Sequence, residues 1–250
     1  MNKLENLRRE DNPVFKKDGS YSQGKMNYYN FQDVRAFITA QQHNENKFEL
    51  YEEILEKEEY TPLKNIFTPD AKVIGDETYT VGVLSCDTST GCCNRNCGCH
   101  LSDVCYADEF RPSNLKYAMA RSVYFNKNDA QTIAKDLEEY GVDIVRINEA
   151  GDFMTTEQVY KILDLCRLLP NVTFYGYVKS DFAREIFEDI YDDYQNLVIH
   201  DSFGKSEILP HYIGIKKAED YPKGYYLCKG KCNTCKMCYL KYVNKACVIH

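Results

Sequence analysis

The sequence has 250 residues, of which 44% are hydrophobic and 28% are charged, and its formal net charge is −7. This composition is typical of a folded globular protein and excludes a chain that is disordered throughout. No run of 18 apolar residues occurs, so we expect no membrane span and no membrane partner. The amino-terminal MNKLENLRREDNPVF lacks the apolar core of a signal peptide, which favours a cytoplasmic protein. The negative charge argues against a protein that coats nucleic acid.

Residues 1–75 are predicted to form an irregular and partly helical N-terminal region. Helices are expected in FQDVRAFITAQQ, from Phe31, and in FELYEEILEKEEY, from Phe48 to Tyr60. The second of these is acidic, and charge of this kind usually belongs to a solvated helix face.

Strands and helices alternate between residues 76 and 220. The predicted strands are 78–86, 143–148, 171–178 and 196–200, with 212–215 as a further candidate, and the predicted helices are 112–126, 129–141, 155–169 and 182–191. Such alternation predicts βαβ units and a parallel sheet. Four or five strands are too few to close an eight-stranded barrel. We therefore expect an α/β fold, either a partial TIM-like barrel or an open parallel sheet.

Several predicted helix ends carry capping residues. Asp129 begins one helix, and Gly141 follows its last turn. Thr155 and Gln158 have the spacing of a capping box. Ser113 is expected to cap the helix that it begins. These signals mark the ends of helices that lie between the predicted strands.

Polar residues follow the predicted strands at their carboxyl ends, where sheets of this kind carry their chemistry. They are Cys86 after the first strand, Asn148, Glu149, Gly151 and Asp152 after the second, Lys179 and Ser180 after the third, and His200 and Asp201 after the fourth. We expect these residues to face one crevice, with Arg146, Asp152 and Lys179 as candidate catalytic residues. The alternative for Gly151 and Asp152 is a tight strand-to-helix turn that serves no cofactor.

Twelve cysteines are the most informative feature of the composition. Six lie between Cys86 and Cys105, in a loop after the first strand, and four lie between Cys228 and Cys238. In a reducing compartment, clustered thiols more often bind metal than form disulfides. The sequence therefore predicts metal binding at two places.

Two further cysteines, Cys166 and Cys247, lie outside both groups. Cys166 shares one apolar helix face with Val159, Ile162 and Leu163. A free cysteine in that setting behaves as a small apolar residue, so we expect Cys166 in the core.

The C-terminal group has the spacing Cys-x3-Cys-x2-Cys-x2-Cys, formed by Cys228, Cys232, Cys235 and Cys238. Four thiolates this close together can hold one compact centre, and short gaps are typical of iron–sulfur loops. Four-thiolate zinc sites usually draw two pairs from separate knuckles. We therefore favour an iron–sulfur cluster of the 4Fe-4S type here, with zinc as the alternative metal.

The first group offers more thiols than one metal site needs. The candidate ligands are Cys86, Cys93, Cys97, Cys99 and Cys105. Cys92 is least favoured, because neighbouring side chains diverge. A cluster on a loop after a strand can leave one iron open to a substrate or cofactor. The alternative is that both groups only tie a loop and the C-terminal segment to the sheet.

Residues 221–250 contain six Lys and no Asp or Glu. This positive charge would offset bound thiolates, so we expect a Cys-rich metal-binding segment. The same residues could form a nucleic-acid patch, with Tyr225, Tyr226, Tyr239 and Tyr242 as stacking faces. Charge compensation is favoured because the rest of the chain is acidic.

Several short motifs follow one another in a recognisable order. They are Ser85-Cys86 after a strand, Cys105-Tyr106-Ala107, a helix with Arg121, Arg146-Ile147-Asn148, Gly151-Asp152-Phe153, Tyr177-Val178-Lys179-Ser180 and the C-terminal KCNTCKMCY. With these motifs the chain resembles the phage-associated gene product 88 family over about residues 75–245. Extra cysteines and a long spacer before Cys105 depart from that family's pattern. The resemblance implies a phage protein in a bacterial host, and the family has no settled activity.

The order of elements also resembles, more distantly, a radical S-adenosylmethionine enzyme. The loop segment CNRNCGC contains Cys-x3-Cys-x-Cys, which is similar to the Cys-x3-Cys-x2-Cys of those enzymes but does not match it. This resemblance implies a cluster in the 86–105 loop that is open to S-adenosylmethionine. It also implies that the turn after the second strand binds the cofactor through Asn148, Glu149 and Gly151, together with Tyr106, which follows Cys105.

Two other functions stay open, and the substrate of any reaction is not indicated. One is a zinc-stabilised protein that binds nucleic acid or a host protein. The other, with less support, is a metal-dependent hydrolase that uses His200, Asp201 and Asp152.

Overall fold

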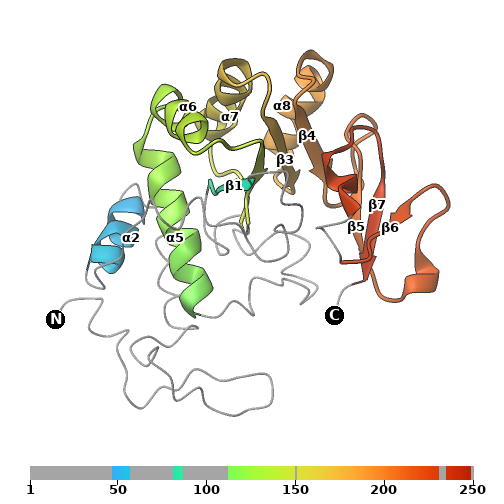
Figure 1. The fold of residues 1–250 in the computed structure, drawn as a ribbon. Helices are drawn as coiled ribbons and strands as arrows, with labels where there is room; N and C mark the ends of the chain where they lie inside the picture. The colour runs from blue at the N-terminus through green and yellow to red at the C-terminus, as the bar shows by residue number, and fades with distance from the viewer. Residues whose placement is uncertain (1–46, 57–80, 87–111, 150, 231–234, 249–250) are drawn as a thin grey trace, which may run out of the picture.

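A computed structural model describes residues 47–56, 81–86, 112–149, 151–230 and 235–248 (Figure 1). Its elements are, in chain order, α2 (Lys47–Glu56), β1 (Val81–Leu84), α5 (Pro112–Lys127), α6 (Ala130–Glu139), β2 (Ile144–Ile147), α7 (Thr156–Leu168), β3 (Thr173–Val178), α8 (Asp181–Ile190), η3 (Tyr191–Asp193), β4 (Leu197–Asp201), β5 (Tyr212–Ile215), η4 (Ala218–Asp220), β6 (Tyr226–Leu227), η5 (Met237–Tyr239) and β7 (Lys245–Val248). Within these residues, no helix is long and apolar enough to cross a bilayer.

The main sheet has four parallel strands in the order β1-β2-β3-β4. Helices α5 and α6 connect β1 to β2, α7 connects β2 to β3, and α8 connects β3 to β4. This confirms a mixed α/β fold with a parallel sheet, as the alternation of strands and helices predicts. The choice between a partial barrel and an open sheet stays a prediction.

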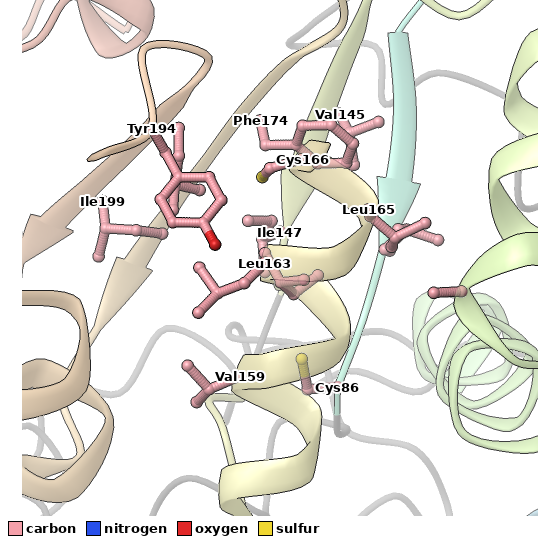
Figure 2. Close-up of a cluster of buried hydrophobic side chains, with 14 of the residues drawn as sticks. Cys86, Val145, Ile147, Val159, Leu163, Leu165, Cys166, Phe174, Tyr194 and Ile199 are labelled. Carbon is pink, nitrogen blue, oxygen red and sulfur yellow. The ribbon is translucent and has the colours of Figure 1, made fainter. Parts of the chain in front are cut away.

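Helices α6, α7 and α8 cover one face of this sheet, because each buries an apolar stripe on it (Figure 1). Figure 2 shows α7 with Val159, Leu163 and Cys166 directed toward the interior that the strands complete. Cys166 is 2% exposed, so its predicted core position is confirmed. Burial raises the pKa of this thiol well above its ordinary value.

The opposite face of the sheet carries a second, smaller core of Val81, Ile144, Tyr175 and Val198. Strand residues alternate between the two faces. Arg146, Tyr177 and His200 each stand two positions along a strand from a member of this core, so they belong to the same face. Arg146, Tyr177 and His200 therefore lie on the face that α6, α7 and α8 do not cover.

Gly176 allows β2 and β3 to approach closely. A Cβ atom at this position would lie 2.9 Å from Ile147 Cβ and 3.0 Å from the Ile147 carbonyl oxygen. Real Cβ atoms do not come this close to a neighbour, so a side chain at residue 176 would force the strands apart.

The capping residues act as expected in two helices and differently in a third. Asp129 accepts a hydrogen bond from the Thr132 amide at 2.7 Å, and Thr155 and Gln158 form a reciprocal capping box. The prediction that Ser113 caps its helix is wrong, because α5 already begins at Pro112. Proline suits the first helical position, since its fixed φ is helical and that amide needs no partner.

A second sheet of three parallel strands follows β4, in the order β5-β7-β6. An isolated parallel bridge between Asp201 and His211 joins it to the end of β4. The candidate strand at 212–215 is confirmed as β5, whereas the sequence analysis did not predict β6 and β7. The division into regions 1–75, 76–220 and 221–250 stays a prediction.

Candidate functional site

Asp152 joins the carboxyl ends of β2 and β3. Its side chain is completely buried. One carboxylate oxygen accepts hydrogen bonds from the amides of Lys179 at 2.7 Å and Ser180 at 2.6 Å, and the other accepts from the Phe153 amide at 2.8 Å. Complete burial raises the pKa of this carboxyl, while Lys179 and the three amides act in the opposite direction. These contacts favour the turn interpretation for Asp152, and its catalytic role stays a prediction.

Asp201 plays the same part at the end of β4. Its carboxylate accepts from the amides of Phe203 at 2.9 Å and Ser206 at 2.7 Å, and also from the Lys205 amide. His200 precedes it in the strand and therefore points to the opposite face. The arrangement gives no common site to His200, Asp201 and Asp152, so it does not favour the hydrolase.

Asn148 joins the ends of β1 and β2. It adopts a left-handed φ of 60°, and its Oδ1 atom accepts a hydrogen bond from the Cys86 amide at 2.8 Å. Among the residues that the structure describes, its buried Nδ2 atom has no hydrogen-bond partner, and neither has the buried hydroxyl of Ser85. Two buried polar groups at neighbouring strand ends thus have unused hydrogen-bonding capacity.

Cys86 lies in the core on the helix-covered face. Its side chain is completely buried among the apolar residues that Figure 2 draws. Its carbonyl oxygen accepts hydrogen bonds from Asn126 Nδ2 at 3.0 Å and Gln158 Nε2 at 2.9 Å. This position favours a core role for Cys86 over metal ligation. The other predicted residues of its loop, Cys93, Cys97, Cys99, Cys105 and Tyr106, lie outside the described residues, as does Cys92.

Glu149 and Gly151 complete the turn after β2. Glu149 forms an ion pair with Arg121 of α5, whose side chain is 4% exposed. Arg146 donates from Nη2 to the Glu149 carbonyl at 3.3 Å. Gly151 has a φ of 81°, which a side chain would strain. The predicted residues Arg146, Asn148 and Glu149 are therefore brought together, and the sequence analysis missed the ion pair with Arg121.

Tyrosine hydroxyl groups lie close to the cysteines of the C-terminal part of the chain. These cysteines are Cys228, Cys235, Cys238 and Cys247. We refer to them as the thiol cluster. The hydroxyl of Tyr212 lies 3.7 Å from Cys228 Sγ. Burial raises the pKa of the Cys247 thiol, and its interaction with Tyr212 acts in the opposite direction. The Cys235 thiol lies 3.7 Å from the Tyr226 hydroxyl. Three of the four are predicted ligands. The fourth predicted ligand, Cys232, lies outside the described residues.

Aromatic side chains join the thiol cluster to the opposite face of the main sheet. Tyr177 of β3 donates a hydrogen bond to Cys238 Sγ at 3.2 Å, and its ring centroid lies 4.7 Å from that of Tyr212. His200 of β4 lies 3.1 Å, through Nε2, from the Cys238 carbonyl oxygen. Burial raises the pKa of Tyr177 well above its ordinary value, so its hydroxyl stays a donor.

Lys245 of β7 is 1% exposed. Its ammonium group donates to the Val243 carbonyl at 2.7 Å and lies 3.4 Å from His200 Nε2. Burial lowers its pKa to about 8, against the opposing charges of Cys238, Cys235 and Cys228. In the described part of the chain, no Asp or Glu pairs with this ammonium. The acidic groups that face it are thiols.

The cysteines in the described residues are free thiols, and no disulfide joins any two of them. They are Cys86, Cys166, Cys228, Cys235, Cys238 and Cys247. Over the same described residues, no three His, Cys, Asp or Glu side chains are gathered at metal-binding separation. The structure thus brings three predicted ligands to one region but does not close a coordination shell around a metal. Sequence patterns single out neither Tyr212 nor Lys245, because only the pairing of β5, β6 and β7 brings these residues and Cys247 to the other thiols.

Comparison with known proteins adds one finding. The family model for gene product 88 matches residues 61–221, a range that holds β1 to β5 and ends before Cys228. No curated protein and no solved structure matches the chain. The likeness to radical S-adenosylmethionine enzymes has no support in these comparisons. The matched range covers more than half of the chain, and the chain belongs to the phage-associated gene product 88 family.

Proposed function

We propose that the protein is an iron–sulfur protein whose thiol cluster holds a metal centre. The observation that carries the proposal is the burial of Lys245 among thiols. A buried ammonium is costly unless an anion compensates it. Neutral thiols would leave this charge unbalanced, whereas metal-bound cysteines are thiolates. A metal centre held by Cys228, Cys235 and Cys238 would therefore supply the missing negative charge.

The hydroxyl groups around the cluster support the same proposal. Tyr177 and Tyr212 approach Cys238 and Cys228 through their hydroxyl groups. Outer hydrogen bonds to sulfur are a standard way in which proteins hold thiolate ligands and tune an iron–sulfur centre. Hydrogen bonds from Tyr177 and Tyr212 would also lower the basicity of the two thiolates, which lie beside buried aromatic rings.

The choice of iron–sulfur over zinc rests on the spacing of the cysteine run. Four thiolates suit either metal. Gaps of two and three residues without a longer spacer are closer to iron–sulfur loops than to paired zinc knuckles. We therefore propose a 4Fe-4S cluster, which when bound supplies one-electron chemistry.

An enzyme of radical S-adenosylmethionine-like type is the finer form of the proposal. Its support is the strand-end region, where Asn148 Nδ2 and the Ser85 hydroxyl are buried without partners in the described ranges. Such groups are satisfied when a polar ligand binds. In this proposal Asn148, Glu149 and Gly151 bind the cofactor, and Arg146 and Lys179 orient the substrate. A second centre would take its ligands from the 86–105 loop without Cys86, since that thiol lies in the core.

A zinc-stabilised protein that binds nucleic acid is the second candidate. Tyr242 is 65% exposed and would offer a stacking face, although its hydroxyl bonds Asp192 at 2.6 Å. Tyr225, Tyr226 and Tyr239 instead contact His211, Cys235 and Tyr175 within the protein. The tail therefore offers fewer stacking faces than its composition suggests, which favours the iron–sulfur proposal.

Metal analysis of protein purified without oxygen tests the proposal. We expect a brown protein with roughly four to eight irons and matching sulfide per chain, in line with one or two 4Fe-4S clusters. The variant Cys235→Ser should lose the iron of the C-terminal centre, whereas Cys166→Ala, which removes a core thiol, should retain it. A colourless protein with stoichiometric zinc would refute the iron–sulfur function and support the second candidate. A protein without any bound metal would refute both.

A further inference from the structure

The pairing of β5, β6 and β7 places Cys247 on the face that carries the other thiols. Tyr226 pairs with Lys245 and Leu227 with Ala246, and the Cys228 amide donates to the Ala246 carbonyl at 2.7 Å. This register continues to place Cys228 beside Cys247. Alternate residues of a strand share a face, so Lys245 and Cys247 point the same way, while Ala246 between them is fully buried on the other side.

One hydroxyl confirms that the two thiols are close. Tyr212 pairs with Lys245 across β5 and β7. Its hydroxyl group lies 3.7 Å from Cys228 Sγ, and it also interacts with the Cys247 thiol. Cys247 is half-buried, as are Cys228, Cys235 and Cys238.

Resting on the iron–sulfur function proposed above, we propose that Cys247 is one of the four thiolate ligands of the C-terminal centre, in place of one cysteine of the run at 228–238. The centre then takes thiolates from β7 as well as from the loop that follows β6. The ligand chemistry is that of a metal with affinity for sulfur, either an iron–sulfur cluster or zinc. Coordination requires the Cys247 thiol to release its proton to solvent as the metal–sulfur bond forms. Lys245, two positions earlier on β7, offsets the charge that this thiolate adds.

The effect of removing Cys247 differs from the effect of removing its hydroxyl neighbour. Loss of an outer hydrogen-bond partner lowers metal affinity by about 10–100-fold. We expect Cys247→Ser, titrated with Zn²⁺ alone, to lose more than about 100-fold in affinity, beyond that range. Tyr212→Phe, which keeps every thiol, should stay within it, and Cys166→Ala should bind as the wild type does.

Differential alkylation of the wild-type protein tests the same point without a substitution. In metal-loaded protein, iodoacetamide should leave Cys247 unlabelled, and removal of the metal with a chelator should raise its labelling at least about tenfold, since a bound thiolate is not free to react. If Cys247 is labelled equally in both states, or if Cys247→Ser keeps wild-type affinity while the wild type binds metal, this inference is wrong and the proposed function stands. If the wild type binds no metal, both are wrong.

Discussion

Replacement of Asp152 separates a structural role from a catalytic one. Asp152→Ala removes the acceptor for three amides, those of Phe153, Lys179 and Ser180, where the side chain is completely buried. A buried amide left without an acceptor costs about 1–3 kcal/mol, so three cost at least about 3 kcal/mol. In a chain of this length each kcal/mol lowers Tm by about 2–4 °C. We therefore expect Asp152→Ala to melt about 6–12 °C below the wild type.

Two further variants control this experiment. Asp152→Asn keeps one oxygen that can serve the amides of Lys179 and Ser180, so its loss of Tm should be about one third as large. Asp164→Ala removes an exposed carboxylate that pairs with Arg167 on α7, and its Tm should not change measurably. Thermal unfolding followed by circular dichroism measures all three. A Tm for Asp152→Ala within 2 °C of the wild type, or equal for Ala and Asn, would refute the argument that the carboxylate holds the turn.

Three other results are expected. Gly176→Ala should cost about 1–3 kcal/mol in unfolding free energy, because its Cβ meets the backbone of β2. Gly82→Ala should cost less, because its Cβ meets side chains and no backbone, with Val142 at 3.2 Å and Leu137 at 3.4 Å. Urea unfolding compares the two variants, and equal stabilities would contradict the packing. Cys166 should react with iodoacetamide only on unfolding, since it is buried and its pKa is raised, and labelling in native protein would contradict its core position. Lys245→Met should lower the reduction potential of the C-terminal centre, because a buried positive charge favours the reduced state. A redox titration measures this potential. An unchanged potential would show that the ammonium does not balance the charge of the centre.

The elements of the α/β region could be predicted because their signals are local. The capping box of Thr155 and Gln158 and the apolar face of α7 are complete within one helix. Each strand of the main sheet is a short β-branched run between such helices. The position of Cys166 follows from the same periodicity, so neighbouring residues alone determined it.

The features that the sequence analysis missed depend on partners distant in the chain. Asp152 accepts from Lys179 and Ser180, and only the parallel register of β2 and β3 brings those amides to it. Strand β6 has two residues, too few for any periodicity to show. Cys247 stands apart from the cysteine run, and the pairing of β6 with β7 is what brings it beside Cys228.

The parallel direction of β6 and β7 has a consequence for how the C-terminal end folds. Neighbouring parallel strands need a long crossover that carries the chain back to its starting edge, and a helix packed on the sheet usually makes it. Here the crossover is residues 228–244, and none of its described side chains is fully buried. Apart from Cys238 and Tyr239, which pack against the second core, apolar contacts contribute little to fixing this return path. An inorganic centre bound within it would take the place of that helix, so β7 should join the sheet only after the metal has bound.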